Sequence, residues 1–221
     1  MSQIFNKKEY ICYLKTKKDD WIKKNTKFTI FIGAGFSKNF GMPNWSEYAE
    51  QKLDLVLNKK KKFITYSTRQ ELLRMDKKHL LTLVNSFCKE DKNSKQYEKE
   101  IFKLNQDRKD KILKENEEFI NSFKKINASF VTTNYDNILE EIFEFKAIET
   151  PLSLHESYPL KPHEVVHIHG NINSENPHDR IIASWLDYYE FYFKENNKKD
   201  MDEFLTYADN IHYFLKNLFL S

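Results

Sequence analysis

Short apolar runs alternate along the chain with longer segments whose apolar residues recur at helical spacing. The runs that are rich in β-branched and aromatic residues predict buried strands. They are KFTIFIG (27–33), ASFVTTN (128–134) and EVVHIHG (164–170), with AIET (147–150) and RIIAS (180–184) as shorter candidates. The last residues, NLFLS (217–221), look like the start of one more strand. Strands separated by helices predict a parallel sheet covered by helices on both faces.

Helical patterns fill most of the remaining chain. Apolar spacing predicts helices over residues 3–24, 44–58, 135–145, 185–196 and 200–216. Asn44 is suited to cap the second of these helices, with Glu47 three residues later as in a capping box. Residues 67–125 contain neither glycine nor proline, which predicts several helices inserted between two parts of the sheet. We expect a single domain over residues 1–221, with a helical insertion at about 60–126.

Composition argues against a membrane or secreted protein. Charged residues make up 31% of the chain, and no run of 18 apolar residues occurs. The N-terminal segment lacks the apolar core of a signal peptide. Cys12 and Cys88 lie far apart without partners at metal-ligand spacing, which favours cytosolic packing thiols. We therefore expect a cytoplasmic protein.

The overall charge is close to balance. With 36 basic and 33 acidic side chains the net charge is +3. The lysine-rich run NKKKKF (58–63) could contact nucleic acid, or it could be a solvated helix end or loop. Because the charges nearly balance, we do not expect nucleic acid as a partner of this domain.

Glycine is scarce and concentrated in one place. The chain has 4 glycines, where an average protein of this length has about 15. Three of them, Gly33, Gly35 and Gly41, fall within the stretch FTIFIGAGFSKNFGMPNW. Two glycines directly after a strand let backbone N–H groups approach a diphosphate closely, although a tight turn without a ligand gives the same pattern. Lys38 stands where the common dinucleotide fingerprint has its third glycine, so an ordinary dehydrogenase loop is excluded.

Polar side chains follow the other two main strands where each strand ends. TTNYD places Thr132, Thr133, Asn134 and Asp136 after an apolar run, although Asn and Asp also cap helices. The carboxyl ends of parallel strands form the ligand crevice of an open α/β sheet. We therefore expect these side chains to lie at a binding site, near Gly33 and Gly35.

The motif HIHG adds a candidate base. The alternation of a strand would place His167 and His169 on the same face. A histidine in a crevice at a strand terminus can serve as a base near neutral pH, although a lone histidine is more often structural. A metal site would draw on His155, His163, His167, His169 and His178. Their spacings match no metal-binding pattern, and no metal is expected.

Taken in order, GAGFS with GMPNW, then TTNYD, then HIHG resemble the motifs of the sirtuin superfamily. The closest likeness is to the bacterial sirtuin-like domains of anti-phage defence proteins, which hydrolyse NAD. The segment IIASWLDYYEFY resembles the part of those domains that follows the histidine. The resemblance covers roughly residues 28–192 and implies an α/β, Rossmann-like fold.

The resemblance also implies roles for particular residues. It assigns the phosphate-binding loop to four residues: Gly33, Ala34, Gly35 and Ser37. Asn134 and Asp136 match the polar pair that faces the nicotinamide and its ribose, and His169 matches the catalytic histidine. Thr133 stands where protein deacetylases of the family usually have glutamine, an exchange typical of the NAD-hydrolysing branch.

Two departures argue against deacetylation. Protein-deacylating sirtuins carry a four-cysteine zinc module, which two distant cysteines cannot form. They also have an arginine shortly after the proline, where this chain reads GMPNWSE.

The family usually continues after its last apolar strand with a glycine-serine turn that holds the adenosine. We therefore expect a chain ending at NLFLS to be the N-terminal part of a longer protein, or a truncated form.

The resemblance thus implies an NAD hydrolase that releases nicotinamide and ADP-ribose and depletes NAD in antiviral defence. NAD would be the substrate, and a homo-oligomer or a partner protein of a defence system would be expected. The alternatives are a non-catalytic module that senses NAD or ADP-ribose for a partner domain, and a helical interaction scaffold. Substitution of His169 separates the first two, because a sensor would keep signalling.

Overall fold

A computed structural model describes residues 28–88, 94–148, 160–174, 181–192, 211 and 214–216. The helix expected over 3–24 and the strand expected from NLFLS lie outside these residues, as does most of the helix expected over 200–216. Cys12, His155 and His178 also lie outside them.

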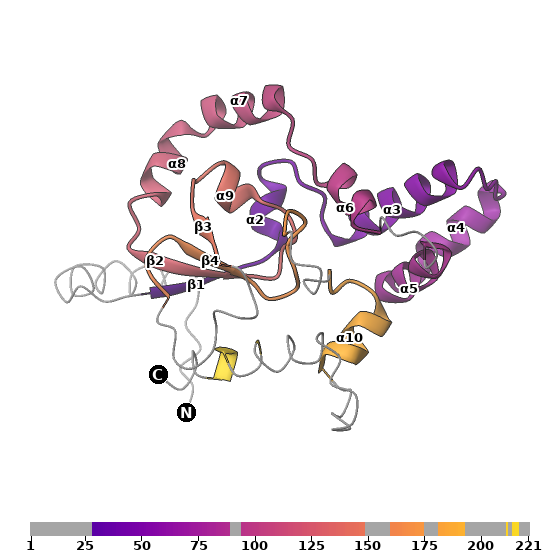
Figure 1. Cartoon of the computed structure of the whole chain (residues 1–221). Coiled ribbons are helices and arrows are strands. Elements are labelled where there is room, and N and C mark those ends of the chain that lie inside the picture. The colour runs from indigo at the N-terminus through magenta and orange to yellow at the C-terminus, as the bar shows by residue number, and fades with distance from the viewer. Residues whose placement is uncertain are drawn as a thin grey trace, which may run out of the picture.

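The described residues contain a four-stranded parallel sheet, shown in Figure 1. Its strands lie in the order β1 (Phe28–Ile32), β2 (Ala128–Thr132), β4 (Glu164–His167) and β3 (Lys146–Ala147). The register pairs Ile32 with Thr132 and Thr132 with His167, so the three longer strands end at one level. The fold is α/β and Rossmann-like, as the alternation of strands and helices predicted.

The two central strands, β2 and β4, are buried on both faces. Phe130 and Val165 pack into a large apolar cluster that includes side chains of α8 (Glu117–Phe123) and α9 (Ile138–Glu141). Val131 and Val166 belong to a second cluster, formed with Phe191, Ile211 and Phe214. In Figure 1, α8 and α9 lie above the sheet and the chain near residue 214 lies below it. A strand that is buried on both faces reads as a continuous apolar run, which explains the composition of β2.

Four sequence predictions on this part of the chain are wrong in detail. The strand expected over 164–170 ends at His167, because the chain turns at Gly170, whose φ is +89°. The run RIIAS forms no strand over residues 181–184. There, Ile182 donates one backbone hydrogen bond, 2.9 Å long, to the carbonyl of His169.

The helix expected over 135–145 is reduced to α9 and is followed by Glu144 in the left-handed region, at φ +60°. The third strand begins at Lys146 and ends at Ala147, earlier than AIET implied.

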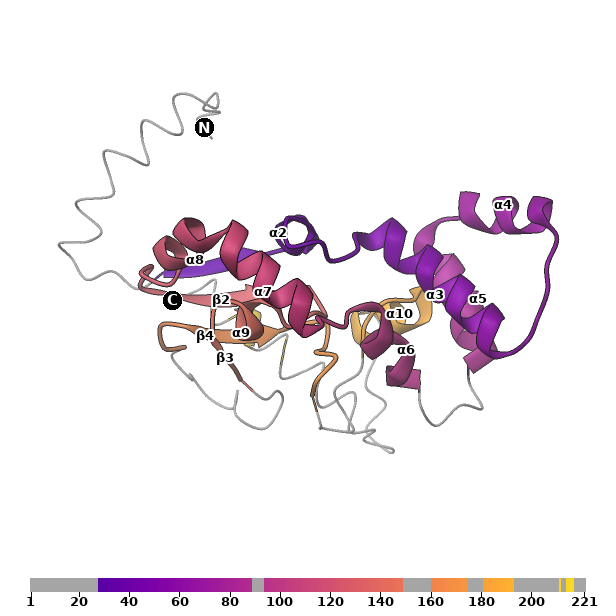
Figure 2. The same cartoon turned by 90° about the horizontal axis from the view of Figure 1, so that it is seen from above.

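Seven helices connect β1 to β2 within the described residues. They are α2 (Ala34–Lys38), α3 (Trp45–Lys59), α4 (Tyr66–Arg74), α5 (Lys77–Cys88), α6 (Ser94–Ile101), α7 (Gln106–Glu115) and α8. Figures 1 and 2 show α3, α4 and α5 extending beyond the edge of the sheet. On this extension α5 contacts α10 (Trp185–Tyr192), where the Trp185 N–H donates to Thr82 Oγ1 at 3.0 Å. Helices from distant parts of the sequence therefore meet beside the ends of the strands.

The capping box predicted at Asn44 is present. Asn44 Oδ1 accepts from the Glu47 N–H at 2.9 Å, and Glu47 Oε2 accepts from the Asn44 N–H at 2.8 Å. These bonds satisfy backbone donors that the first turn of a helix leaves unpaired. They fix the start of α3 and therefore the position of Trp45.

We expect Asn44→Ala to lower the free energy of unfolding by about 1 kcal/mol, because the first turn of α3 loses its side-chain acceptor. Asn44→Ser keeps an acceptor at the same place and should retain most of the stability. Urea unfolding of the two variants measures the difference. Equal stability of the alanine and serine variants would contradict this account of the cap.

A pair of opposite charges is buried between α3 and α6. The Lys52 ammonium is hydrogen-bonded to Glu98 Oε1, and it also donates to Asn85 Oδ1 at 2.8 Å. The Tyr48 hydroxyl donates to the same Glu98 oxygen at 3.2 Å. Both charged side chains are 5% exposed. Burial and the nearby Glu98 raise the pKa of Tyr48 well above its ordinary value, so this hydroxyl keeps its proton.

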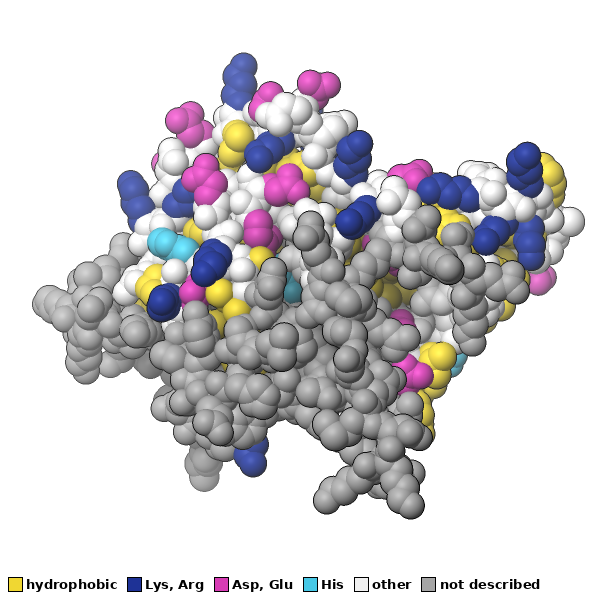
Figure 3. Space-filling view, viewed as in Figure 1, with side chains coloured by type: hydrophobic (Ala, Val, Ile, Leu, Met, Phe, Trp, Pro, Cys, Tyr) yellow, Lys and Arg dark blue, Asp and Glu magenta, His cyan; other side chains and the backbone are white. Residues whose placement is uncertain are grey.

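The surface visible in Figure 3 mixes both signs of charge. Lys and Arg side chains alternate with Asp and Glu over the upper part of the molecule, where α7 and α8 lie. Among the described helices, none combines the length and the apolar content needed to cross a bilayer.

Candidate functional site

A cavity of about 200 Å³ opens where β2 and β4 end. Its polar wall consists of Asn44, Thr133, Asn134, Asp136 and His169, and its remaining lining is Ala34, Pro43, Trp45, Tyr48, Phe102, Tyr135 and Tyr188. The structure thus brings together five residues that the sequence had singled out: Ala34, Thr133, Asn134, Asp136 and His169. The cavity lies at the sheet edge where ligands of open α/β folds bind.

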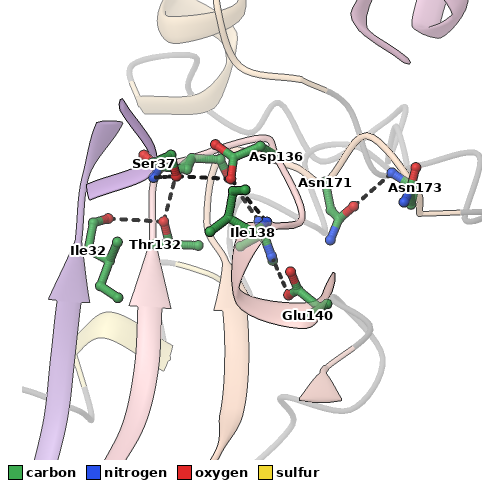
Figure 4. A network of polar contacts seen from close by, with 10 residues as sticks. Ile32, Ser37, Thr132, Asp136, Ile138, Glu140, Asn171 and Asn173 are labelled. Carbon is green, nitrogen blue, oxygen red and sulfur yellow. Dashed lines mark hydrogen bonds and ion pairs between the residues drawn. The ribbon is translucent and has the colours of Figure 1, made fainter. Parts of the chain in front are cut away.

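A chain of buried hydrogen bonds supports the polar wall. Asn134 Nδ2 donates to Ser37 Oγ at 2.9 Å, and Ser37 Oγ donates to Asp136 Oδ1 at 2.9 Å. Thr132 Oγ1 accepts from the Asn134 N–H and donates to the Ile32 carbonyl, both at 3.0 Å. Figure 4 shows Ser37, Thr132 and Asp136 gathered above the ends of the strands. The side chains of Asn134 and Asp136 are therefore held in fixed positions by α2 and β2.

Ser37 has a different position from the glycines with which the sequence groups it. It is buried behind the cavity wall, and its hydroxyl connects Asn134 to Asp136. Gly33, Ala34 and Gly35 are exposed on the surface instead. The four loop residues thus divide into an exposed backbone segment and a buried connecting side chain.

The carboxyl group of Asp136 is buried, and burial raises its pKa. The Ile138 N–H, which donates to Asp136 Oδ1 at 3.2 Å, and the Ser37 hydroxyl act in the opposite direction, as does the charge of His167. Asp136 thus combines a buried carboxyl group with one oxygen already held by two donors. Its other oxygen can interact with a ligand.

His169 lies beyond β4, in the turn before Gly170. The Tyr188 ring meets the His169 ring at 75°, with centroids 5.3 Å apart, and Phe191 also packs near it. Burial, together with the positive charge of Lys78 on α5, lowers the pKa of His169 to about 4. The imidazole is therefore neutral at physiological pH, which is the state that can accept a proton.

His167 does not share the position of His169. Because β4 ends at His167, the alternation of a strand does not extend to residue 169, and that sequence prediction is wrong. His167 is 3% exposed, and its ring lies between the Asn134 carbonyl and the Glu140 carboxylate. Burial lowers its pKa, but the hydrogen bonds and negative charge of Glu140, with the Asn134 carbonyl, outweigh it, so the pKa of His167 is raised.

The backbone conformation requires glycine at only one of the three positions in this stretch, Gly41. Gly41 has φ +77°, a conformation that residues with a Cβ rarely adopt, so the backbone itself favours glycine at this position. A Cβ added at Gly33 or Gly35 would meet nothing within 4 Å, and neither residue has a positive φ. Packing does not require glycine at these two positions, which leaves space for a ligand against the exposed backbone.

The sequence did not identify several groups at the site. Lys78 lies on α5 and Phe102 lies just after α6, in a region where no sequence motif marks them. Tyr188 and Glu140 come next to the two histidines only through the tertiary fold, where Tyr188 packs against His169 and Glu140 bonds to His167. A signal for Tyr135 existed within TTNYD, but only the structure shows that it lines the cavity and that its hydroxyl donates to the Ile182 carbonyl at 2.7 Å. In the described part of the chain, no group of three or more His, Cys, Asp or Glu side chains could hold a metal ion.

Comparison with known proteins supports the sirtuin resemblance. Residues 128–217 match the family described as SIR2-like domain. This stretch begins at β2 and contains Asn134, Asp136 and His169, and the match indicates an NAD-related function. No curated protein and no solved structure matches the chain significantly.

Proposed function

We propose that the protein hydrolyses NAD at this cavity, giving nicotinamide and ADP-ribose. One observation carries the proposal: a neutral His169 and a fixed Asn134 line one cavity beside an exposed Gly33–Gly35 backbone. The match of residues 128–217 to the SIR2-like domain supports NAD as the substrate.

The cavity suits one end of the dinucleotide. A volume of about 200 Å³ accommodates the nicotinamide and its ribose but not the whole molecule. Tyr48, Phe102 and Tyr135 supply an aromatic lining for the nicotinamide ring. The backbone of Gly33–Gly35 borders the neighbouring surface groove, and Ala34 lines both the groove and the cavity. The diphosphate would then lie over this backbone, with the adenosine further out.

The reaction needs one bond broken and one proton accepted. The bond between the ribose C1′ and the nicotinamide nitrogen breaks, and its electron pair goes to that nitrogen. Water adds to C1′, and His169 accepts the proton that the water loses. With its amide nitrogen bound to Ser37, Asn134 has its amide oxygen to orient the water or a ribose hydroxyl. The outer oxygen of Asp136 would accept a hydrogen bond from the nicotinamide carboxamide.

The sequence resemblance to anti-phage domains supports a proposal for the biological setting. We propose that hydrolysis depletes NAD in the cytoplasm during antiviral defence, and that the protein forms a homo-oligomer or a complex with a partner protein of the defence system.

Chromatography of NAD incubated with the protein tests the proposed activity, beside an Asn134→Ala variant. We expect nicotinamide and ADP-ribose in equal amounts from the wild type, and a loss of about 10²-fold in the variant, because the water or ribose is no longer oriented. If the protein binds NAD without converting it, a sensing module replaces the hydrolase as the best account.

The glycine loop gives a prediction in which stability and binding change in opposite directions. Gly35→Ala should raise the free energy of unfolding by about 0.5–1 kcal/mol, because alanine is the better residue within α2. It should weaken NAD binding about tenfold or more, or ~1.4 kcal/mol, because the methyl group occupies space next to the diphosphate. Thermal unfolding and calorimetric titration with NAD measure the two effects.

Gly41→Ala serves as the control for this comparison. It should lower stability, because φ is +77°, a conformation that strains alanine. Unchanged NAD affinity in Gly35→Ala would place the diphosphate elsewhere.

A further inference from the structure

The His167 ring lies between two hydrogen-bond acceptors. Its Nδ1 is 2.8 Å from the Asn134 carbonyl oxygen, and its Nε2 is 2.8 Å from Glu140 Oε1. A neutral imidazole carries one N–H, so only the doubly protonated ring can donate to both acceptors. The arrangement therefore describes a buried imidazolium paired with a carboxylate, next to the residue that we place in the reaction.

We propose that the His167 imidazolium, held by Glu140, is a positioning group that fixes the backbone of Asn134 and so directs its side chain toward Ser37. The structural coupling is a property of the protein alone. Its consequence for catalysis rests on the proposed function.

Three contacts hold Asn134, which lies just after the end of β2. Its N–H donates to Thr132 Oγ1 at 3.0 Å, its carbonyl accepts from His167, and its amide nitrogen donates to Ser37. Because no strand pairing continues through Asn134, the contact of its carbonyl with His167 fixes the orientation of the peptide. Loss of that contact would let the peptide, and with it the side-chain amide, rotate.

The groups around His167 favour its charged form. Glu140 reaches it from α9, and Asp136 adds a second negative charge from the segment after β2. The other oxygen of Glu140 is buried and has no hydrogen-bond partner among the described residues. His167 is thus the group that compensates this carboxylate, while burial alone opposes the charge.

The pH dependence follows from which proton leaves the ring. Below its raised pKa, His167 donates to both acceptors, so the contact with Asn134 is fully present. As the pH rises through that pKa, the remaining proton stays on Nε2, next to the carboxylate. The lone pair of Nδ1 then faces the lone pairs of the Asn134 carbonyl, and the contact becomes repulsive. The side chain of Asn134 should therefore lose its fixed position on the alkaline side.

Glu140→Gln tests this coupling sharply. A glutamine amide can donate to Nε2, so a neutral ring keeps its proton on Nδ1 and still donates to Asn134. The variant removes the charge but preserves both hydrogen bonds. Glu141→Gln, at the next position of α9, is the matched control, because it removes an equal charge from the same helix.

Nitrogen NMR of the ligand-free protein, from about pH 5.5 to about 9.5, follows the His167 ring and the Asn134 side-chain amide together. In the wild type and in Glu141→Gln, the Asn134 signal should move with the midpoint of His167. In Glu140→Gln the Asn134 signal should keep its low-pH position over the whole pH range. His167→Phe, which has no ring donor, should displace the Asn134 signal at every pH.

Three results would overturn the proposal: a neutral His167 ring at pH 6, an Asn134 signal that ignores the titration of His167, or an unmoved signal in His167→Phe. With NAD present, hydrolysis by the wild type should fall about 10- to 100-fold across the same titration, and Glu140→Gln should abolish this fall. Coupled NMR signals without any hydrolysis would instead disprove the proposed function and leave the coupling intact.

Discussion

Replacing His169 with alanine is expected to lower the rate of NAD hydrolysis by about 10²- to 10⁴-fold, because the water then has no base to accept its proton. The loss should appear in kcat more than in KM, since His169 acts on the water rather than on the remote parts of the dinucleotide. Steady-state kinetics with His79→Ala, an exposed histidine on α5, as the control measures it. A variant that retains the wild-type rate would remove His169 from the mechanism.

The pH dependence provides a second readout for the same residue. A base must be unprotonated to act, and the pKa of His169 is about 4. The rate should therefore hardly change as the pH falls from neutral to about 5.5, and it should decrease as the pH approaches about 4. Lys78→Met removes the positive charge that helps to lower this pKa and should move the acidic decrease to higher pH. An acidic midpoint that Lys78→Met does not move would contradict the assignment.

Replacing Lys52 with methionine is expected to lower the free energy of unfolding by about 3–5 kcal/mol, the second large effect. Methionine fills a similar volume, but it leaves the Glu98 carboxylate buried without its cation. The other oxygen of Glu98 already lacks a hydrogen-bond partner among the described residues, so the remaining charge would be compensated only by Tyr48. Chemical unfolding monitored by circular dichroism measures the loss.

The double variant Lys52→Met/Glu98→Leu should recover most of that stability, because it leaves no buried charge. Lys111→Met, which breaks the exposed contact of Lys111 with Glu115, should show no measurable change. If the double variant is as unstable as the single one, the shape of the side chains rather than the unpaired charge accounts for the loss.

The elements that the sequence predicted best are those with a strong local cause. The run FTIFI forms β1 and ASFVT forms β2, because β-branched and aromatic residues favour strands. Only β2 is buried along its whole length; β1 is an edge strand of the described sheet that is half-buried, with Phe31 49% exposed, so the prediction of a buried strand there is wrong in part. The capping box of α3 was equally predictable, since both of its bonds lie within four residues. The rule that strand ends form the ligand crevice also placed Asn134 and Asp136 next to the glycine loop.

The elements that the sequence missed depend on tertiary contacts. Ile182 is fully buried, yet residues 181–184 form no strand. An apolar run alone does not distinguish a buried strand from a buried segment without strand pairing. The alternation in HIHG continues past the end of β4, so it wrongly grouped His167 with His169. The two histidines have different surroundings: Glu140 bonds to His167, whereas Lys78 and Tyr188 lie near His169. These three groups come from three different helices, which the sequence pattern does not place together.

The measurement that tests the central claim most directly is proton NMR of NAD during incubation with the full chain. The account predicts that the nicotinamide riboside signals of NAD disappear while free nicotinamide and ADP-ribose appear in equal amounts. His169→Ala should leave the NAD spectrum unchanged over the same time. Intact NAD in the presence of folded wild-type protein that binds it, or equal conversion by His169→Ala, would contradict the account.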